Sequence, residues 1–357
     1  MSDELTFKEA CEWYLNEPTE KLGRKKNINA HSSLEWMYMQ RPASILIKGW
    51  KKPVKYGAKT RQHPHKVVSM DDSSGLFEGR LIGDITNRDV TKMISVLRND
   101  KGLSNAGINI YLVYLRAVCN YARNKLDVPF PRFPQIKMLP TNGREYYLKP
   151  EIAKQWLRFL DPLRADMALF GLATGQRKAN IVGLKWCWLS KDLTRMVIPM
   201  DETKNGSGHT VMLNRQATQV LEKRRLMRKQ LLARYPHLSL EYVFVQEDKK
   251  HLGKPLSGSS ITKDAWRRSI VMYNQSVRLR AERNGTELDK SLLIPEGGTL
   301  VFHSLRHSFA TWLNQAGTDL DDIMLVGGWK SMEACRRYVK KDEARAKEVG
   351  SRIESLL

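Results

Sequence analysis

The stretch FHSLRHSFAT, residues 302–311, places a histidine and an arginine three residues apart at the start of a predicted helix. Residues i and i+3 of a helix share one face, so His303 and Arg306 are expected to lie side by side. Two cations held together are unfavourable as core packing, but they suit the binding of an anion. The alternative is an ordinary pair of surface side chains, and this stretch alone does not decide between the two.

The composition of the 357-residue chain indicates a polyanionic partner. Lys and Arg number 60 against 38 Asp and Glu, which gives a formal net charge of +22. Such an excess favours nucleic acid, because phosphate contacts and counterion release both contribute to binding. An anionic membrane surface and a merely soluble basic protein are the weaker alternatives. The length suits two domains of about 100–200 residues each.

No cysteine or histidine pattern is typical of a metal site or a disulfide framework. The four cysteines are far apart and include no CxxC pair. His63 and His65 form an HPH pair that nothing nearby completes, so this pair is interpreted as part of a loop. The N-terminal sequence is acidic and polar, unlike a signal peptide, and no apolar run is long enough to span a membrane. We expect no cofactor, no metal and a location in the reducing cytoplasm.

The first 130 residues predict a small helical unit. Apolar residues recur at helical spacing after Thr6, Thr86 and Ser104, which are typical helix N-caps. Residues 36–70 contain eight Lys or Arg and no Asp or Glu, interrupted by Gly and Pro. This stretch predicts an extended basic loop or short hairpin. It either follows a phosphate backbone or is simply solvated, and the sequence leaves both interpretations open.

A proline-rich segment separates this unit from a second one. Residues 129–145 contain four prolines, which indicates a linker. Helical patterns resume beyond it, and RMVIPMDETKNGSGHTVMLN, residues 195–214, has two short apolar runs around KNGSG. That arrangement predicts a β-hairpin. The predicted fold is therefore mainly α-helical with one small antiparallel sheet.

Two more stretches of the second unit carry side chains suited to an anion. In ATGQRKANIVGLKW, residues 173–186, Arg177 follows Gly175 at the start of a predicted helix. The N-terminus of a helix favours phosphate, and an arginine there adds a bidentate hydrogen-bond donor. Lys204 lies at the tip of the predicted hairpin. Each residue alone is equally well explained as an ordinary exposed side chain, and only the order and spacing of the stretches make them specific.

The stretch GGWKSMEACRRYV, residues 327–339, holds Trp329 and Tyr338 nine residues apart. A tyrosine hydroxyl can accept a phosphoryl group, whereas a phenylalanine at the same position can only pack. Arg336 and Arg337 directly precede the tyrosine. We interpret them as helix-surface residues that contact a DNA backbone.

In this order, TGQRKANIVGLKW, TKNGSGHTVML, HSLRHSFAT and VGGWKS followed by a tyrosine resemble the motifs of the tyrosine recombinase family, also called the phage integrase family. The H-x-x-R motif combined with a terminal tyrosine is the most specific part. LTFKEACEWYL and LSNAGINIYLVYLRAVCNYA resemble the family's core-binding domain. The resemblance covers most of the chain and implies an integrase of a temperate phage or other mobile element.

The resemblance implies a two-domain, C-shaped clamp around DNA. In the basic insertion, Lys51, Lys52 and Lys55 are candidates for contact with the DNA backbone. The implied parts are a helical, SAM-like core-binding domain (1–131) with its basic insertion (36–70), a linker (132–148), the catalytic domain (149–345) and a C-terminal helix or tail (346–357). The last part would pack either on a neighbouring subunit or on its own domain.

The resemblance also implies the chemistry of the site. Arg177 and Arg306 would hold the non-bridging oxygens of a DNA phosphodiester, on which charge builds in the transition state. Tyr338 would attack the phosphorus, and His303 would accept its proton.

Lys204 would protonate the departing 5′ oxygen, and Trp329 would offer its indole N–H to the phosphate. The product would be a 3′-phosphotyrosyl enzyme, which conserves the energy of the phosphodiester, so neither ATP nor a metal is expected. The implied partners are double-stranded DNA attachment sites and three further copies of the chain, which would exchange strands through a Holliday junction. An excisionase and a DNA-bending host factor are further expectations, in the cytoplasm and nucleoid of a bacterial host.

The chain departs from the family pattern at Asn180, where the family usually has an acidic residue three positions after the first arginine. Ser304 replaces an aspartate that is frequent in the H-x-x-R motif, which is a minor change. Two alternatives stay open, and Asn180 supports only the second. One is a type IB topoisomerase, which shares the tyrosine and the arginine–lysine pocket, and the other is a DNA-binding protein whose catalytic pocket has decayed.

Overall fold

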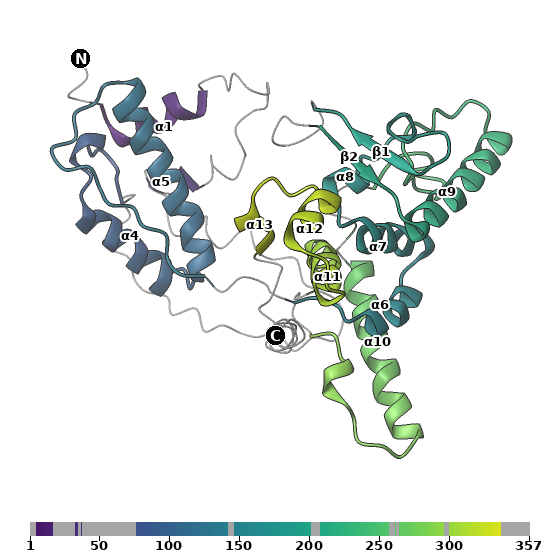
Figure 1. The fold of residues 1–357 in the computed structure, drawn as a ribbon. Helices are drawn as coiled ribbons and strands as arrows, with labels where there is room; N and C mark the ends of the chain where they lie inside the picture. The colour runs from purple at the N-terminus through teal and green to yellow at the C-terminus, as the bar shows by residue number, and fades with distance from the viewer. Residues whose placement is uncertain are drawn as a thin grey trace, which may run out of the picture. The chain divides into compact units, whose positions relative to one another are not determined.

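A computed structural model of the protein describes residues 5–16, 33–34, 37, 76–141, 146–200, 208–256, 261, 264–295 and 300–336. The chain divides into two units, Met1–Gly143 and Arg144–Leu357, and the division falls within the linker predicted from the prolines. None of the helices in the described ranges is long and apolar enough to cross a membrane. The predicted class, mainly α-helical with a small antiparallel sheet, is confirmed (Figure 1).

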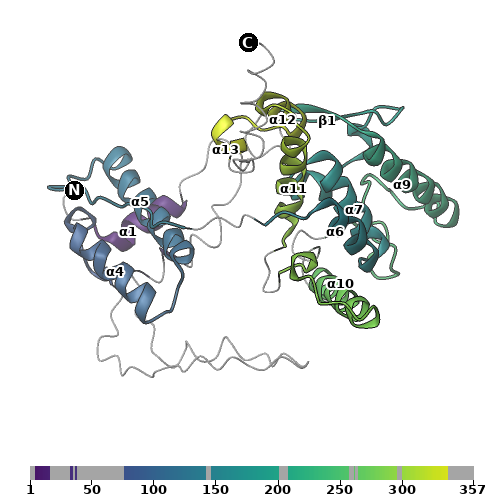
Figure 2. The ribbon, with the colours of Figure 1, turned by 60° about the horizontal axis from the view of Figure 1, so that its bottom comes forward.

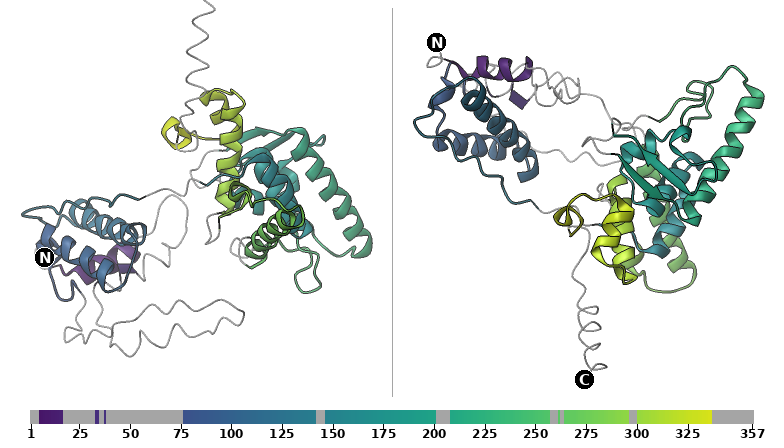
Figure 3. Two further views of the ribbon diagram at one scale, coloured as in Figure 1. Left: turned by 90° about the horizontal axis from the view of Figure 1, so that it is seen from below. Right: turned by 45° about the horizontal axis from the view of Figure 1, so that its top comes forward.

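The first unit is helical because each of its helices has a local start signal and one apolar face. Its elements are α1 (Phe7–Asn16), the 3₁₀ turn η1 (Ile82–Asp84), α4 (Asn87–Asn99) and α5 (Asn105–Lys125). The backbone N–H groups of Thr6 and Thr86 donate to the carboxylates of Glu9 and Asp89 at 2.9 Å, which satisfies N–H groups that a helix start otherwise leaves open. Helices α1 and α4 lie beside α5 (Figure 3), and their apolar faces pack on it.

The two ends of the proline-rich segment are hydrogen-bonded to different units. On the first unit, the side-chain amide of Asn109 donates to the carbonyl of Leu139 at 2.9 Å and accepts from its N–H at 2.8 Å. On the second unit, the N–H of Leu148 donates to Ser308 Oγ at 2.9 Å, and its carbonyl accepts from Trp312 Nε1 at 2.8 Å. These bonds satisfy the backbone N–H and carbonyl groups of Leu139 and Leu148.

The second unit is built around α7. Its elements are α6 (Pro150–Trp156), η2 (Leu157–Phe159), α7 (Pro162–Thr174), α8 (Lys178–Val182), η3 (Trp186–Trp188), β1 (Arg195–Ile198), β2 (His209–Met212), α9 (Arg215–Arg234), α10 (Asp264–Arg283), η4 (Lys290–Leu292), α11 (Phe302–Gln315), α12 (Leu320–Gly327) and α13 (Met332–Arg336). The central helix α7 packs between α11 and α9 (Figure 2). Eight of its thirteen residues are buried, and six of these eight are apolar or glycine, as expected for a helix inside a core.

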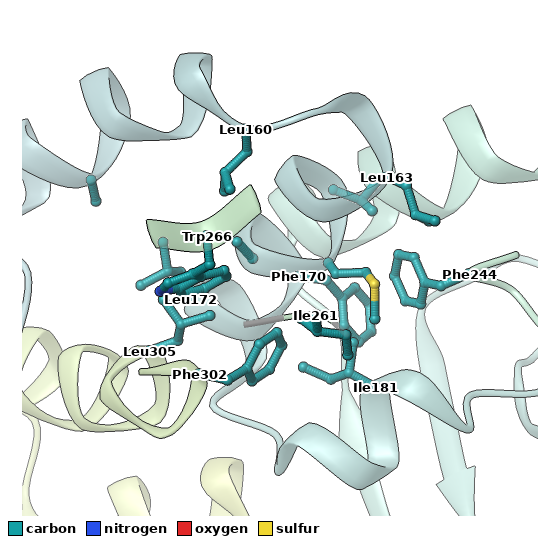
Figure 4. Close-up of a cluster of buried hydrophobic side chains, with 14 of the residues drawn as sticks. Leu160, Leu163, Phe170, Leu172, Ile181, Phe244, Ile261, Trp266, Phe302 and Leu305 are labelled. Carbon is teal, nitrogen blue, oxygen red and sulfur yellow. The ribbon is translucent and has the colours of Figure 1, made fainter. Parts of the chain in front are cut away.

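Large apolar side chains from several helices fill the core beside α7 (Figure 4). Trp156 and Trp266 meet edge to face with their ring centroids 4.7 Å apart. Each indole N–H has an acceptor, Ser269 Oγ at 2.9 Å for Trp156 and the carbonyl of Leu300 at 3.0 Å for Trp266. The core therefore holds α6, α10 and the start of α11 in fixed positions, and the N–H groups of Trp156 and Trp266 both have acceptors.

The predicted hairpin is present as an antiparallel pair with Arg195 opposite Met212 and Ile198 opposite His209. Met196, Ile198 and Val211 point into the core, which fixes the register because a shift of β1 by one residue would expose Met196 and Ile198. Helix α9, whose sequence is strongly basic, is tied to α7 by a buried arginine. Arg224 is 1% exposed and forms an ion pair with Asp166.

Candidate active site

Arg177 is placed by the sharp end of α7. Gly175 ends that helix in the left-handed conformation (φ 62°), and Arg177 then forms the N-cap of α8 with its side chain exposed. A Cβ on Gly175 would lie 2.4 Å from the ring of Phe309, so glycine is required for both its backbone angle and its contact. Because α8 is a single short turn, the charge at this point comes mainly from the guanidinium of Arg177.

Arg306 forms the floor of the site and is only 2% exposed. Its Nη1 donates to the carbonyls of Gly175 and, at 2.7 Å, of Gly327. Its guanidinium carbon lies 3.6 Å from the centroid of the Trp329 ring. The surface-pair interpretation of His303 and Arg306 is therefore wrong for Arg306, which is a buried cation that links two backbone segments.

Trp329 is 7% exposed and lies over Arg306 because two glycines precede it. Gly328 ends α12 in the left-handed conformation (φ 66°). A Cβ on Gly327 would lie 1.7 Å from the Trp329 ring, so only glycine lets the ring fold back over this turn. The indole face thus contacts the guanidinium, a geometry that stabilises a buried arginine.

Two histidines lie in the field of the same arginines. His303, at the start of α11, is exposed at the surface, yet partial burial of its ring and then the charges of Arg306 and Arg177 lower its pKa below the ordinary 6.5. His209, the first residue of β2, is half-buried. Its pKa is lowered by burial and then by Arg177, Arg306 and Lys330. Both histidines are therefore neutral near pH 7 in the absence of DNA.

A buried amide connects His209 to the start of α8. Gln176 is 2% exposed, and its Oε1 lies 3.2 Å from His209 Nε2 and 3.2 Å from the Nδ2 of Asn180. Asn180 therefore acts as a donor at a position where the family usually has an acidic residue. No described contact joins Asn180 to Arg177.

The structure brings together four of the six predicted site residues, Arg177, His303, Arg306 and Trp329. The predicted Lys204, Tyr338 and Arg337 lie outside the described residues, as do Lys51, Lys52 and Lys55, while Arg336 is exposed at the end of α13. Sequence reasoning missed His209, Gln176 and Lys330. The available signal was their position, since each lies within a stretch that resembles a family motif.

Comparison with known proteins identifies the family of the chain. The model of the phage integrase family matches residues 151–345, more than half of the sequence. The chain belongs to the phage integrase family. Members of this family are tyrosine recombinases, so this integrase is a site-specific DNA recombinase, an enzyme that cuts and rejoins DNA, as predicted. The comparisons give no support to a topoisomerase or to a decayed DNA-binding protein.

Relatives agree with this assignment. The integrase of Salmonella phage P22 is 26% identical over 369 residues, which cover 99% of this chain and 81% of that protein. The Tn1549 transposon integrase, solved in complex with circular intermediate DNA, is 18% identical with a TM-score of 0.53 over 76% of this chain and 87% of that one. A lambda integrase dimer bound to a core site is 16% identical with a TM-score of 0.50, covering 72% and 81%. The two structures show a shared fold.

Proposed function

We propose that Arg177, His303, Arg306 and Trp329 surround the scissile phosphate of a DNA attachment site. The observation that carries this proposal is the electrostatic environment of His303 and His209. After burial, every group that shifts the pKa of either histidine is a cation. Cations gathered at one place repel each other, and a bound phosphodiester would offset this repulsion.

In the proposed cleavage step, Tyr338 is the nucleophile. Its hydroxyl oxygen forms a bond to phosphorus, the bond between phosphorus and the 5′ oxygen breaks, and the strand is left with a 3′-phosphotyrosyl link. A tyrosine hydroxyl has a pKa of about 10, so it needs an acceptor for its proton. His303 suits this role because its lowered pKa leaves it neutral and able to take up the proton.

The leaving 5′ oxygen needs a proton in turn, and Lys204 is the proposed donor. Arg177 and Arg306 stabilise the charge on the non-bridging oxygens, and the indole N–H of Trp329 contributes a further bond to the phosphate. Religation is the reverse reaction with a 5′ hydroxyl from the partner strand. The phosphotyrosyl link retains the energy of the broken bond, so the cycle needs no ATP.

We further propose that four copies pair two attachment sites and exchange strands in two steps through a Holliday junction. The predicted core-binding domain (1–131) and catalytic domain (149–345), joined by the linker 132–148, would both bind the same duplex. Lys51, Lys52 and Lys55, together with the arginines before Tyr338, would contact the DNA backbone. Residues 346–357 would pack on a neighbouring copy, while an excisionase and a DNA-bending host factor would set the direction of the reaction.

A nicked suicide duplex carrying the element's own attachment site tests the nucleophile. Cleavage beside the nick releases a short fragment and traps the covalent protein–DNA adduct. We expect the adduct with wild type and none with Tyr338→Phe, which should still bind the duplex. An adduct of normal yield in the phenylalanine variant would refute the assignment.

A substrate with a bridging 5′-phosphorothiolate tests the general acid. The sulfur leaving group departs without a proton, so it should restore cleavage to Lys204→Ala. The same substrate should give no comparable gain to Arg177→Ala, in which the phosphate ligand itself is missing. Equal behaviour of the two variants would show that Lys204 is not the proton donor.

A further inference from the structure

Two backbone segments carry proposed phosphate ligands, and the buried side chain of Arg306 is hydrogen-bonded to both segments. One segment is Gly175–Gln176–Arg177 and the other is Gly327–Gly328–Trp329. The Nη1 atom of Arg306 donates to the first carbonyl of each segment, Gly175 O and Gly327 O. Arg177 and Trp329 therefore depend on a shared anchor within α11.

His209 joins the same two segments from the hairpin. Its Nε2 lies 3.2 Å from the side-chain oxygen of Gln176. Its ring packs so closely on Gly328 that a Cβ there would lie 2.7 Å from Nε2 and 2.8 Å from Cδ2. Figure 1 shows β2, α8 and α12 side by side at this point, and α12 directly contacts β2.

The hydrogen bonds around Gln176 have a fixed direction. Asn180 Nδ2 donates to Gln176 Oε1 at 3.2 Å, and Gln176 Nε2 faces the carbonyl of Thr174 at 3.5 Å. The amide oxygen therefore faces both Asn180 and His209. Since an amide oxygen can only accept, His209 must donate from Nε2. The side chain of Asn180 thus orients the amide of Gln176 so that its oxygen accepts from both Asn180 and His209.

We propose that His209 is a positioning residue of the recombination site, which fastens the segments of Arg177 and Trp329 to the hairpin through its Nε2–H bond to Gln176 and its contact with Gly328. This inference rests on the proposed function, because it is the phosphate-binding role of Arg177 and Trp329 that requires a fixed geometry. A small displacement of a phosphate ligand slows a reaction strongly while changing overall DNA affinity little, because most DNA affinity comes from backbone contacts elsewhere.

One rival role is direct contact between the phosphate and the other ring nitrogen, Nδ1. Two substitutions separate the roles, because a glutamine amide nitrogen falls near the place of Nε2 and an asparagine amide nitrogen near that of Nδ1. Leucine fills the volume and donates from neither position. The set His209→Gln, His209→Asn and His209→Leu therefore reports which ring nitrogen matters.

The test measures single-turnover cleavage of the suicide duplex together with the dissociation constant for the same duplex. For loss of one buried hydrogen bond at a reacting site we expect cleavage by His209→Asn and His209→Leu to fall about tenfold or more, with the dissociation constant within about twofold of wild type. His209→Gln should remain within about threefold of wild type. The proposal would be overturned if cleavage by His209→Gln fell as far as cleavage by His209→Leu. It would also be overturned if His209→Asn alone kept the cleavage rate of wild type.

Substitution of Asn180 provides an independent test if the His209 variants fold poorly. Asn180→Asp replaces the donor with an acceptor that faces Gln176 Oε1. If the amide turns to donate to it, the amide oxygen meets the carbonyl of Thr174 and the Nε2–H of His209 loses its acceptor. Asn180→Ala removes one bond but leaves the Gln176 oxygen facing His209. We expect cleavage to be slower in the aspartate variant than in the alanine variant, and the opposite order would count against the proposal. Wild-type adduct formation through Tyr338 tests the proposed function separately, since all these comparisons are ratios to wild type.

Discussion

Replacing Arg306 with lysine keeps the charge of the buried cation but removes its shape. The guanidinium donates to the carbonyl of Gly175 and, at 2.7 Å, to the carbonyl of Gly327. It also stacks on Trp329, with its carbon 3.6 Å from the ring centroid. A single ammonium cannot keep both bonds and the stacking. One buried carbonyl without a partner costs about 1–3 kcal/mol, and a desolvated cation–π contact contributes about 1–2 kcal/mol.

For Arg306→Lys we therefore expect the free energy of unfolding to fall by about 2–4 kcal/mol, measured by urea denaturation monitored by tryptophan fluorescence. Single-turnover cleavage of the suicide duplex should fall at least about 100-fold, because a donor aimed at the transition-state charge is lost. Arg225→Lys is the matched control, since Arg225 is exposed on α9 and makes one long bond of 3.4 Å. Unfolding of Arg306→Lys within about 0.5 kcal/mol of wild type would refute the bridging role.

Further predictions concern backbone and pH. Gly175→Ala should lower the free energy of unfolding by about 2–4 kcal/mol, because the new Cβ clashes with Phe309 and the backbone is also strained. Gly285 has the same φ of 62° but open space around it, so Gly285→Ala should lower the free energy of unfolding by only about 1 kcal/mol. Equal effects in thermal denaturation would contradict the packing argument. The pKa of His303 and of His209 is lowered on folding, so the unfolded chain binds protons more readily and stability should fall as pH drops through 6.5. The loss between about pH 7.5 and pH 5.5 should be smaller when both are replaced by glutamine, and an unchanged loss would show that other groups titrate.

Local signals were enough to predict the helices and the hairpin. Thr86 and Ser104 precede α4 and α5 as expected, and Ser104 Oγ accepts from the N–H of Gly107 at 3.3 Å. These starts depend on side chains within three residues, which a sequence displays directly. The hairpin was predictable for the same reason, since two apolar runs flank a glycine-containing turn.

The interior of the site could not be predicted because its contacts join distant residues. The partners of Arg306 Nη1 are 131 and 21 positions away, and spacing within the H-x-x-R motif gives no sign that this arginine is buried. Gln176 and His209, 33 positions apart, were missed because an amide beside an arginine and a histidine in a strand are ordinary by composition. Only the folded chain shows that Gln176 and His209 lie within hydrogen-bond distance of each other beside the proposed phosphate ligands.

The most direct test of the account is to identify the residue that carries the DNA. The trapped adduct from the suicide duplex is digested with nuclease and trypsin, and the peptide that retains a 3′-phosphonucleotide is sequenced by mass spectrometry. The account predicts the modification on Tyr338, in the tryptic peptide of residues 338–340. Modification of any other tyrosine, or of a serine or histidine, would contradict it.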